Sequence, residues 1–412
     1  MKLKQIRVDG YKNLINCVVN LGDFNVLVGP NNSGKSNLLE AIQMLWPISF
    51  GSDDLRNGAF KGLTLPPRVG YSICHLEKHM RKPMTIGVMF ETSTKGELWI
   101  GDYEVTVQWH YSGKEKGGFL SETLTAKNPH KRGPARRYIW RKGRQLEVLG
   151  KPYVISSQNS SLQALRSLYP DFEGLPAELE AFAQAINWIA VTKIFALSPK
   201  GLRDEIDKEK PIDFIQVSSF DLSLIVDNIK KEGKYYELFR ETLCDILDLE
   251  DVRFQAKDMP TPTAKGKPRE TAKRMRLFLI KSAGNPYSLV EEYSDGTFAV
   301  AAILAVLVSK EHIMPILCLE ELENCLHPAA VEKLLRFLQD HADKWPVLIT
   351  THSPYLLNGV KPEDVNVAVV DETGGAHFEK VKSSRQLRDY LNKRLMSFGE
   401  LLVKDFQGFR EG

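Results

Sequence analysis

Hydrophobic and polar residues alternate with a period of two along two stretches of the chain, residues 1–14 and 85–155. The second stretch consists of short apolar-polar segments separated by Gly and Lys turns, a pattern typical of an antiparallel sheet. Residues 161–250 change to helical spacing, which predicts an inserted helical lobe. A Pro-, Thr- and Lys-rich segment at 258–276 then predicts an exposed loop.

A continuous apolar run, Phe24–Val28, predicts a buried strand, and a helix is expected directly afterwards at Asn37–Trp46. The connecting residues match the pattern G-x-x-x-x-G-K-[ST], in which backbone N–H groups and a lysine surround phosphate oxygens. A chance glycine-rich turn is the alternative, and the flanking strand and helix make it the weaker interpretation. The expected ATP-binding residues are Gly29, Asn31, Asn32, Ser33, Gly34, Lys35, Ser36 and Asn37.

A second apolar strand is predicted at residues 316–319, and two acids, Glu320 and Glu321, follow it. Open α/β sheets bind ligands at the carboxyl ends of their strands. We therefore expect Glu320 to hold Mg²⁺ together with the Ser36 hydroxyl, and Glu321 to orient or deprotonate the attacking water. The alternative is a strand that ends in solvated acids, which is common in proteins.

Two further segments suit an ATP site. The segment VLITTHSPYLL predicts a strand that ends at Thr351, so that His352 emerges where it could contact a γ-phosphate, although an isolated histidine is more often structural. The segment SDG, which begins at Ser294, precedes a long apolar helix at Phe298–Val308. A helix N-terminus with Ser294 as N-cap is a second potential anion site, and Gly296 belongs to it.

The order of these motifs, with ENCLHP and TTHSP at the end, resembles the ABC-type ATPases of the RecF, SMC and OLD group. The resemblance implies an α/β fold: an ABC-ATPase head with a mixed, largely parallel P-loop sheet, an antiparallel β subdomain and an inserted helical lobe. It also implies a homodimer or higher oligomer with composite ATP sites. Ser294 and Gly296 would serve the nucleotide of a second copy, and His352 would be the switch histidine.

The chain also departs from this family. Glu320 stands where Asp is usual and Leu322 where Pro is usual, a change that bears on the rate of hydrolysis. The residues after His352 are too few for the Toprim domain of OLD nucleases, so we expect a stand-alone ATPase. The predicted domains are an N-terminal ATPase lobe at 1–160, a helical insertion with an exposed basic loop at 161–275 and a C-terminal ATPase lobe at 276–412.

Composition is that of an ordinary globular protein: 412 residues, 43% hydrophobic, 26% charged and a net charge of +3. The near-neutral charge does not imply a general nucleic-acid-binding field. Five cysteines without a C-x-x-C pair are expected to be reduced thiols in a cytoplasmic protein. The longest apolar run is too short to cross a bilayer, so no membrane role is expected.

Two functions follow from these expectations. The first is an ATP-driven switch that controls a separate effector, such as a nuclease or toxin, in bacterial anti-phage defence. The alternative is a RecF-like ATPase that binds DNA in repair, because residues 131–144 hold seven basic residues, no acid and two aromatic residues. A solvated surface hairpin explains that basic stretch about equally well.

Overall fold

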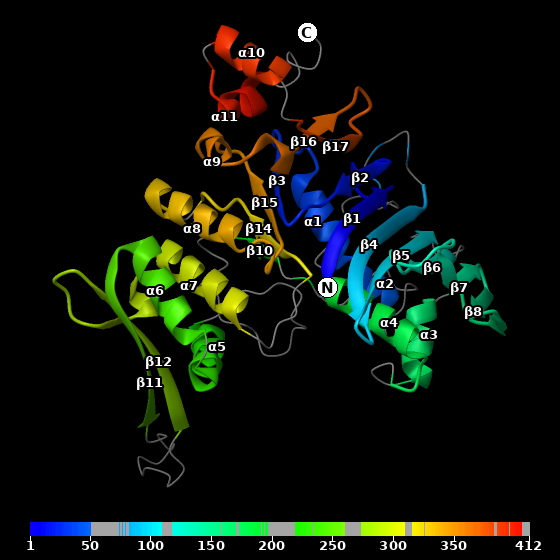
Figure 1. Cartoon of the computed structure of the whole chain (residues 1–412), viewed down its shortest axis with the longest axis horizontal. Helices are drawn as coiled ribbons and strands as arrows, with labels where there is room; N and C mark the ends of the chain where they lie inside the picture. Colours follow the sequence, from blue (N-terminus) through cyan, green and yellow to red (C-terminus); the bar gives the residue numbers. More distant parts are fainter. Residues whose placement is uncertain are drawn as a thin grey trace.

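The computed structural model describes the chain except residues 51–73, 75, 77–78, 80–81, 109–117, 158, 170–172, 191, 193, 197–218, 234, 260–272, 310–314, 325, 383–384, 395 and 406–412. Two large sheets lie side by side in it, and helices cover them (Figure 1). A smaller sheet projects from the part of the molecule that carries α5 and α6. Much of the expected loop at 258–276 lies outside the described residues.

An eight-stranded antiparallel sheet has the order β2-β1-β4-β5-β6-β7-β8-β9, so the expected antiparallel sheet is present and the first two strands extend it. Buried and partly exposed residues alternate along β5, which shows that one face of the sheet packs on a core. Its strands are β1 (Lys2–Asp9), β2 (Cys17–Asn20), β4 (Met84–Thr94), β5 (Glu97–Gln108), β6 (Gly118–Lys127), β7 (Arg136–Lys142), β8 (Gln145–Val148) and β9 (Lys151–Val154).

A six-stranded sheet has the order β10-β14-β15-β3-β16-β17 and is parallel except for the β16–β17 pair. Its central strands are continuous apolar runs, as expected for strands covered on both faces. The strand expected at 316–319 is displaced by one residue, because Glu320 still pairs with Thr350. The strands are β3 (Phe24–Val28), β10 (Ile194–Ala196), β14 (Leu317–Glu320), β15 (Val347–Thr351), β16 (Val365–Val370) and β17 (Ala376–Lys380).

The helices belong to two hydrophobic cores, one on each face of the six-stranded sheet. One core joins that sheet to the antiparallel sheet and contains α1 (Lys35–Gln43), α2 (Leu45–Ser49), α3 (Ser161–Leu168) and α4 (Ala177–Ala190). The other contains α5 (Ser219–Glu232), α6 (Tyr236–Leu247), α7 (Asp295–Val308) and α8 (Pro328–Asp340).

Two sequence expectations change here. The helix expected at 37–46 begins two residues earlier, at Lys35, and is interrupted at Met44, after which α2 starts. The helices expected to form one lobe are divided between the two cores, because the apolar faces of α3 and α4 pack on the antiparallel sheet whereas those of α5 and α6 pack on α7. The proposed domain boundaries stay a prediction.

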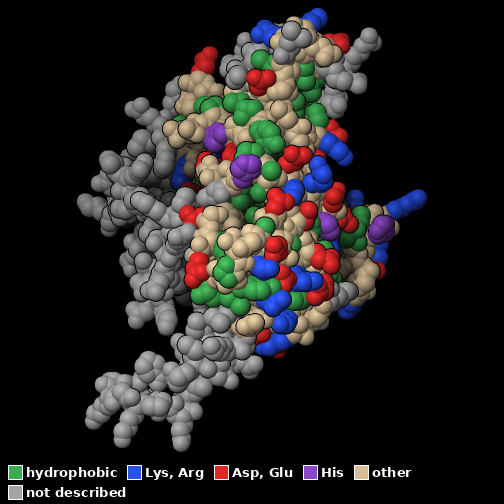
Figure 2. Space-filling view, turned by 90° about the vertical axis from the view of Figure 1, so that its left-hand side faces the viewer, with side chains coloured by type: hydrophobic (Ala, Val, Ile, Leu, Met, Phe, Trp, Pro, Cys, Tyr) green, Lys and Arg blue, Asp and Glu red, His purple; other side chains and the backbone are tan. Residues whose placement is uncertain are grey.

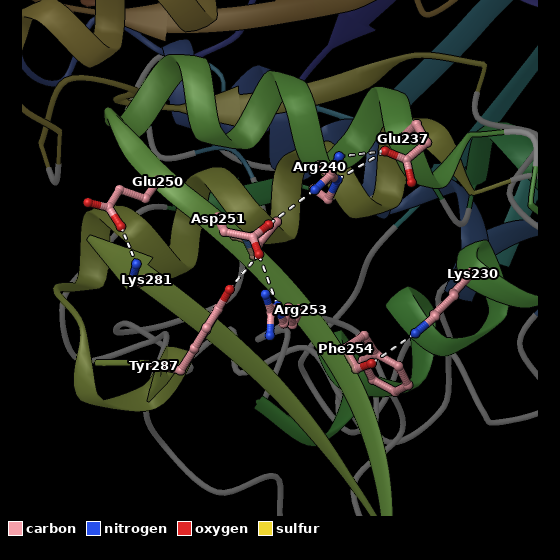
Figure 3. Close-up of polar contacts among 10 residues, drawn as sticks. Lys230, Glu237, Arg240, Glu250, Asp251, Arg253, Phe254, Lys281 and Tyr287 are labelled. Atoms are coloured by element: carbon pink, nitrogen blue, oxygen red, sulfur yellow. Dashed lines mark hydrogen bonds and ion pairs between the residues drawn. The ribbon is translucent and has the colours of Figure 1, made fainter. Parts of the chain in front are cut away.

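A small sheet of β11 (Leu249–Met259), β12 (Lys273–Ser282) and β13 (Ser288–Leu289) follows α6. The carboxylate of Asp251 fixes the base of this sheet, since it accepts hydrogen bonds from Arg240, Arg253 and Tyr287 (Figure 3). These donors lower the pKa of Asp251, with the Tyr287 hydroxyl as the largest cause. Basic and acidic side chains of the described residues intermingle on the face shown in Figure 2.

The chain after β15 continues through α9 (Pro354–Asn358), η4 (Pro362–Asp364), α10 (Arg385–Arg394), α11 (Phe398–Glu400) and the π-helical turn η5 (Leu401–Asp405). The α11 segment packs directly on α9, and Gly399 N donates to Asn358 Oδ1 at 2.8 Å. A short 3-10 turn, η3 (Val290–Glu292), precedes α7. Among the described residues, none of the helices has the length and apolar character needed to cross a membrane.

Candidate active site

The phosphate loop lies between β3 and α1, as the sequence predicts. Asn32 and Gly34 have positive φ angles of 61° and 93°, which let the backbone turn back on itself before the helix. A Cβ on Gly29 would lie 2.8 Å from both Ala368 Cβ and Ser33 Oγ, so this position requires glycine. Because Gly34 is the N-cap and has no side chain, first-turn N–H groups of α1 are left for an anionic ligand.

Lys35 is 5% exposed, and its ammonium group bridges the loop. Lys35 Nζ donates to the carbonyl oxygens of Gly29 and Pro30, both at 2.8 Å. Burial lowers the pKa of Lys35 to about 8, and the nearby carboxylates, Glu321 first, oppose this shift. A charged donor is thus held in place next to the pocket, where phosphate oxygens can replace the loop carbonyls as acceptors.

The Ser36 hydroxyl donates a hydrogen bond to Glu320 Oε1, which joins the first turn of α1 to the end of β14. A hydroxyl and a carboxylate are hard oxygen donors of the kind that Mg²⁺ prefers. Their close approach fits the metal assignment made from the sequence, in which these two side chains hold the ion.

Glu321 adopts a positive φ of 50°, a strained conformation for a residue with a side chain. Its backbone N–H donates to Thr350 O at 3.0 Å, and its carboxylate accepts a hydrogen bond from the Asn324 amide. Glu321 Oε1 also lies 3.6 Å from His352 Nε2. The two residues predicted to be catalytic are therefore neighbours, at the ends of two adjacent parallel strands.

These side chains surround a pocket of about 800 Å³. The lining residues combine the phosphate loop with Glu321 and His352, which lie more than 280 positions later in the sequence (321 − 37 = 284). The pocket is lined by Lys12, Asn13, Asn31, Asn32, Ser33, Gly34, Lys35, Ser36, Asn37, Glu321, His352, Val370 and Gly374. The volume and the array of polar groups suit a nucleotide.

Sequence reasoning missed four further residues that line this pocket, Lys12, Asn13, Val370 and Gly374. Asn13 supports the phosphate loop, because its side chain donates to Asn32 O at 3.0 Å and accepts from Asn37 Nδ2 at 2.7 Å. The Y-K-N turn after β1 was the available signal, but it matches no spacing motif. The sequence reasoning also missed Glu323, whose carboxylate binds the backbone of His352.

Ser294 is the N-cap of α7, as expected, and its hydroxyl accepts a hydrogen bond from Thr297 N at 3.3 Å. Neither Ser294 nor Gly296 is among the described residues that line the pocket. Helix α7 packs on one face of the six-stranded sheet, whereas α1 packs on the other (Figure 1). The structure thus brings the phosphate loop, Glu321 and His352 together and keeps the Ser294 motif apart from them.

The basic stretch 131–144 is only partly a surface feature, which corrects the sequence interpretation. The side chains of Arg141 and Glu122 are both fully buried, with Arg141 Nη1 3.6 Å from Glu122 Oε2. Arg141 also donates to the Gly143 and Ser156 carbonyls at 2.7 and 2.8 Å, and Tyr138 is 1% exposed. Arg141 is therefore a core residue of the antiparallel sheet and cannot contact nucleic acid.

Two family models of ATPase domains match this chain. The family described as "AAA ATPase domain" matches residues 1–248, and the family described as "AAA domain, putative AbiEii toxin, Type IV TA system" matches residues 219–358. A comparison with curated proteins finds no match.

Among solved structures, an SMC head bound to the C-winged helix domain of ScpA is 14% identical, with a TM-score of 0.50, and the match covers 92% of this chain and 98% of that one. Two other SMC heads have lower scores. The head domain from Thermotoga maritima is 15% identical, with a TM-score of 0.42 and coverage of 93% and 100%. The head with an extended coiled coil from Pyrococcus furiosus is 12% identical, with a TM-score of 0.44 and coverage of 96% and 99%.

The likeness to the first of these heads concerns the fold alone, and it confirms the predicted α/β head with its mixed and antiparallel sheets. The family match spans more than half of the chain and includes the phosphate loop. The chain belongs to the AAA ATPase domain family, as an ATP hydrolase whose fold is similar to that of an SMC head.

Proposed function

We propose that this ATPase is a switch in which ATP joins two copies of the chain and the closed state controls a separate effector protein. The observation that carries the proposal is the separation of the two anion-binding helix ends. The pocket contains the phosphate loop of α1, while Ser294 begins α7 on the opposite face of the sheet. A helix end that does not line its own pocket is available to the pocket of a second copy.

Within one pocket we assign roles from the contacts. Lys35 neutralises the phosphates, and Ser36 with Glu320 would hold Mg²⁺, which would supply further positive charge near the phosphate oxygens. Glu321 orients the attacking water and accepts its proton, because its carboxylate lines the pocket. His352 lies against Glu321 and lines the pocket, where it would contact the γ-phosphate as the switch histidine.

The effector assignment is supported by the match of residues 219–358 to a family described by an AbiEii toxin and a Type IV TA system. That description favours a role in bacterial anti-phage defence, with a nuclease or toxin as the controlled partner. The SMC head in the comparison was crystallised with a domain of another protein, so heads of this fold do engage partners. We infer the same kind of partner contact for this chain.

Complementation between two inactive variants tests the composite site. Ser294→Arg should bind ATP but lose hydrolysis, because the bulky cation blocks the surface offered to the other copy. Lys35→Ala should lose most of its affinity for the nucleotide. A mixture in which subunits exchange contains heterodimers with one intact composite site, so part of the ATPase activity should return. Exchange is verified with differently labelled copies, and exchange without recovered activity would show that each chain hydrolyses ATP alone.

A RecF-like DNA-binding function is the second candidate. The burial of Arg141 reduces the support for this function. Some support remains, because four cations of the basic stretch are exposed: Arg132, Arg136, Lys142 and Arg144. Lys131 and Arg137 are exposed as well, but they pair with Glu97 and Glu147 at 2.7 and 3.1 Å. The remaining charge is smaller than the sequence suggests, so the switch is the better-supported function.

A further inference from the structure

We propose that Glu323 is a positioning residue of the ATPase reaction and that it fixes His352 in place against Glu321. The inference rests on the role proposed above for His352. Glu323 Oε1 accepts two hydrogen bonds, one from His352 N at 2.9 Å and one from Thr351 Oγ1 at 2.7 Å. Glu323 itself contacts the main chain of the histidine and leaves the imidazole ring free to face the pocket.

The contact extends over three consecutive residues at the end of β15. Thr351 is completely buried, and its hydroxyl accepts a hydrogen bond from Ser353 N at 2.9 Å while it donates to Glu323. One carboxylate oxygen thus orders the backbone on both sides of His352. Because the end of β15 is held by these hydrogen bonds, the imidazole of His352 is attached to an ordered backbone. Residues on loops ordinarily lack such an ordered backbone.

Glu323 and Glu321 belong to the same short turn, in which Asn324 N donates to Glu321 O at 3.0 Å. Glu321 Oε1 faces the His352 ring at 3.6 Å, while Glu323 binds the His352 backbone. Because both acids are fixed within one turn, the Glu323 contact determines how far the imidazole stands from Glu321. Loss of the contact would therefore change the catalytic geometry more than the affinity for ATP.

The other carboxylate oxygen of Glu323 argues against a purely stabilising role. Glu323 Oε2 is buried and has no hydrogen-bond partner among the described residues. A buried carboxylate oxygen without a partner costs free energy, so a residue present only for stability would be better as a neutral side chain. The charged acceptor instead strengthens the two hydrogen bonds made by Oε1.

Steady-state kinetics of the full chain with Glu323→Ala and Glu323→Gln test the inference. We expect kcat of Glu323→Ala to fall roughly tenfold to a hundredfold, because this is the effect of losing one hydrogen bond to a charged group. KM for ATP should change by less than about threefold. Glu323→Gln keeps an acceptor oxygen but not the charge that strengthens the two hydrogen bonds, so it should recover part of kcat. Equal loss in both variants, or a change confined to KM, would overturn the assignment.

A double-mutant cycle with His352→Ala separates positioning from general damage. If Glu323 acts through His352, the double variant Glu323→Ala/His352→Ala should be no slower than His352→Ala alone. Losses that multiply would show that Glu323 acts independently and would reject the proposal. Normal kcat in His352→Ala would reject the histidine role itself, whereas the complementation of Ser294→Arg by Lys35→Ala would still report on the composite site.

Discussion

Lys35 and Arg141 are both buried cations, yet they differ in what surrounds them. Arg141 is enclosed by a buried carboxylate, Glu122, and by the backbone carbonyls of Gly143 in the β7–β8 turn and of Ser156 after β9, so its donors are used within the core. Lys35 contacts loop carbonyls beside an open pocket, and the nearest acids belong to other elements. Burial lowers the pKa of both side chains. A buried charge therefore indicates function only where its partners can be exchanged for a ligand.

The largest expected effects concern the pocket. Lys35→Ala should weaken ATP binding by about a hundredfold, because two or more charge-assisted contacts to phosphate are lost. Glu321→Gln should bind ATP normally and reduce kcat by roughly 10²-fold to 10⁴-fold, since it cannot accept a proton. Equilibrium binding of labelled ATP and single-turnover hydrolysis measure the two quantities. Tight binding by Lys35→Ala would contradict the phosphate-loop assignment, and normal turnover by Glu321→Gln would contradict the role of the base.

Lys35 and Glu321 could be predicted from the sequence because each belongs to a local motif. Lys35 belongs to a fixed spacing, and Glu321 follows an apolar strand directly. Glu323 and Asn13 could not be assigned in this way, since their contacts join residues that lie far apart in the chain. The relevant partners become visible only when β14, β15 and β3 are aligned in one sheet.

Arg141 was assigned wrongly for the opposite reason. A run of basic residues in the sequence looks like one exposed surface, but the residues of a strand alternate between two faces. Within β7, Ile139 and Arg141 share one face and are buried, whereas Lys142 on the other face is exposed. The buried partner of Arg141, Glu122, lies on the neighbouring strand β6 and gives no signal in the basic segment itself.

The second prediction tests that correction. Arg141→Met should destabilise the folded protein by about 3–5 kcal/mol, because Glu122 is left buried without its counterion. Arg137→Met is the matched control: it removes a cation of the same strand whose ion pair with Glu147 is half exposed, at a cost below about 1 kcal/mol. Denaturant unfolding of both variants gives the comparison. Similar midpoints for the two variants would mean that Arg141 is not a core residue.

The third prediction concerns the cations of the basic stretch that stay exposed. If Arg132, Arg136 and Lys142 contact DNA phosphates, replacing all three with Ser should flatten the log–log dependence of affinity on salt by about two to three units. ATPase activity without DNA should not change. A triple Ser replacement at Arg336, Lys361 and Lys382, which are also exposed, controls for net charge. Equal slopes in the two triple variants would remove support for the DNA-binding alternative.

The smallest expected effect is a proton linkage at Lys35. Its pKa of about 8 lies well below the usual value of 10.5 because burial disfavours the charged form. Below pH 8 the Lys35 ammonium is already charged in the free protein, whereas above pH 8 a growing fraction of Lys35 is neutral. Phosphate oxygens stabilise the charged form, so ATP binding should take up protons as the pH rises from 7 to 9 and affinity should fall over the same range.

Calorimetric titration of the protein with ATP at pH 7 and pH 9, in buffers of different ionisation enthalpy, measures this uptake. Less than one proton per site is expected from a single lysine, and the number should be larger at pH 9 than at pH 7. Arginine side chains such as Arg137 and Arg141 stay protonated throughout this range, and the partners of Arg141 are fixed in the core. Neither arginine should contribute to the proton uptake. Arg137→Met, with its pocket intact, should therefore show the same uptake as the wild type. Proton release on binding, or no difference between the two pH values, would mean that Lys35 does not change its charge when the nucleotide arrives.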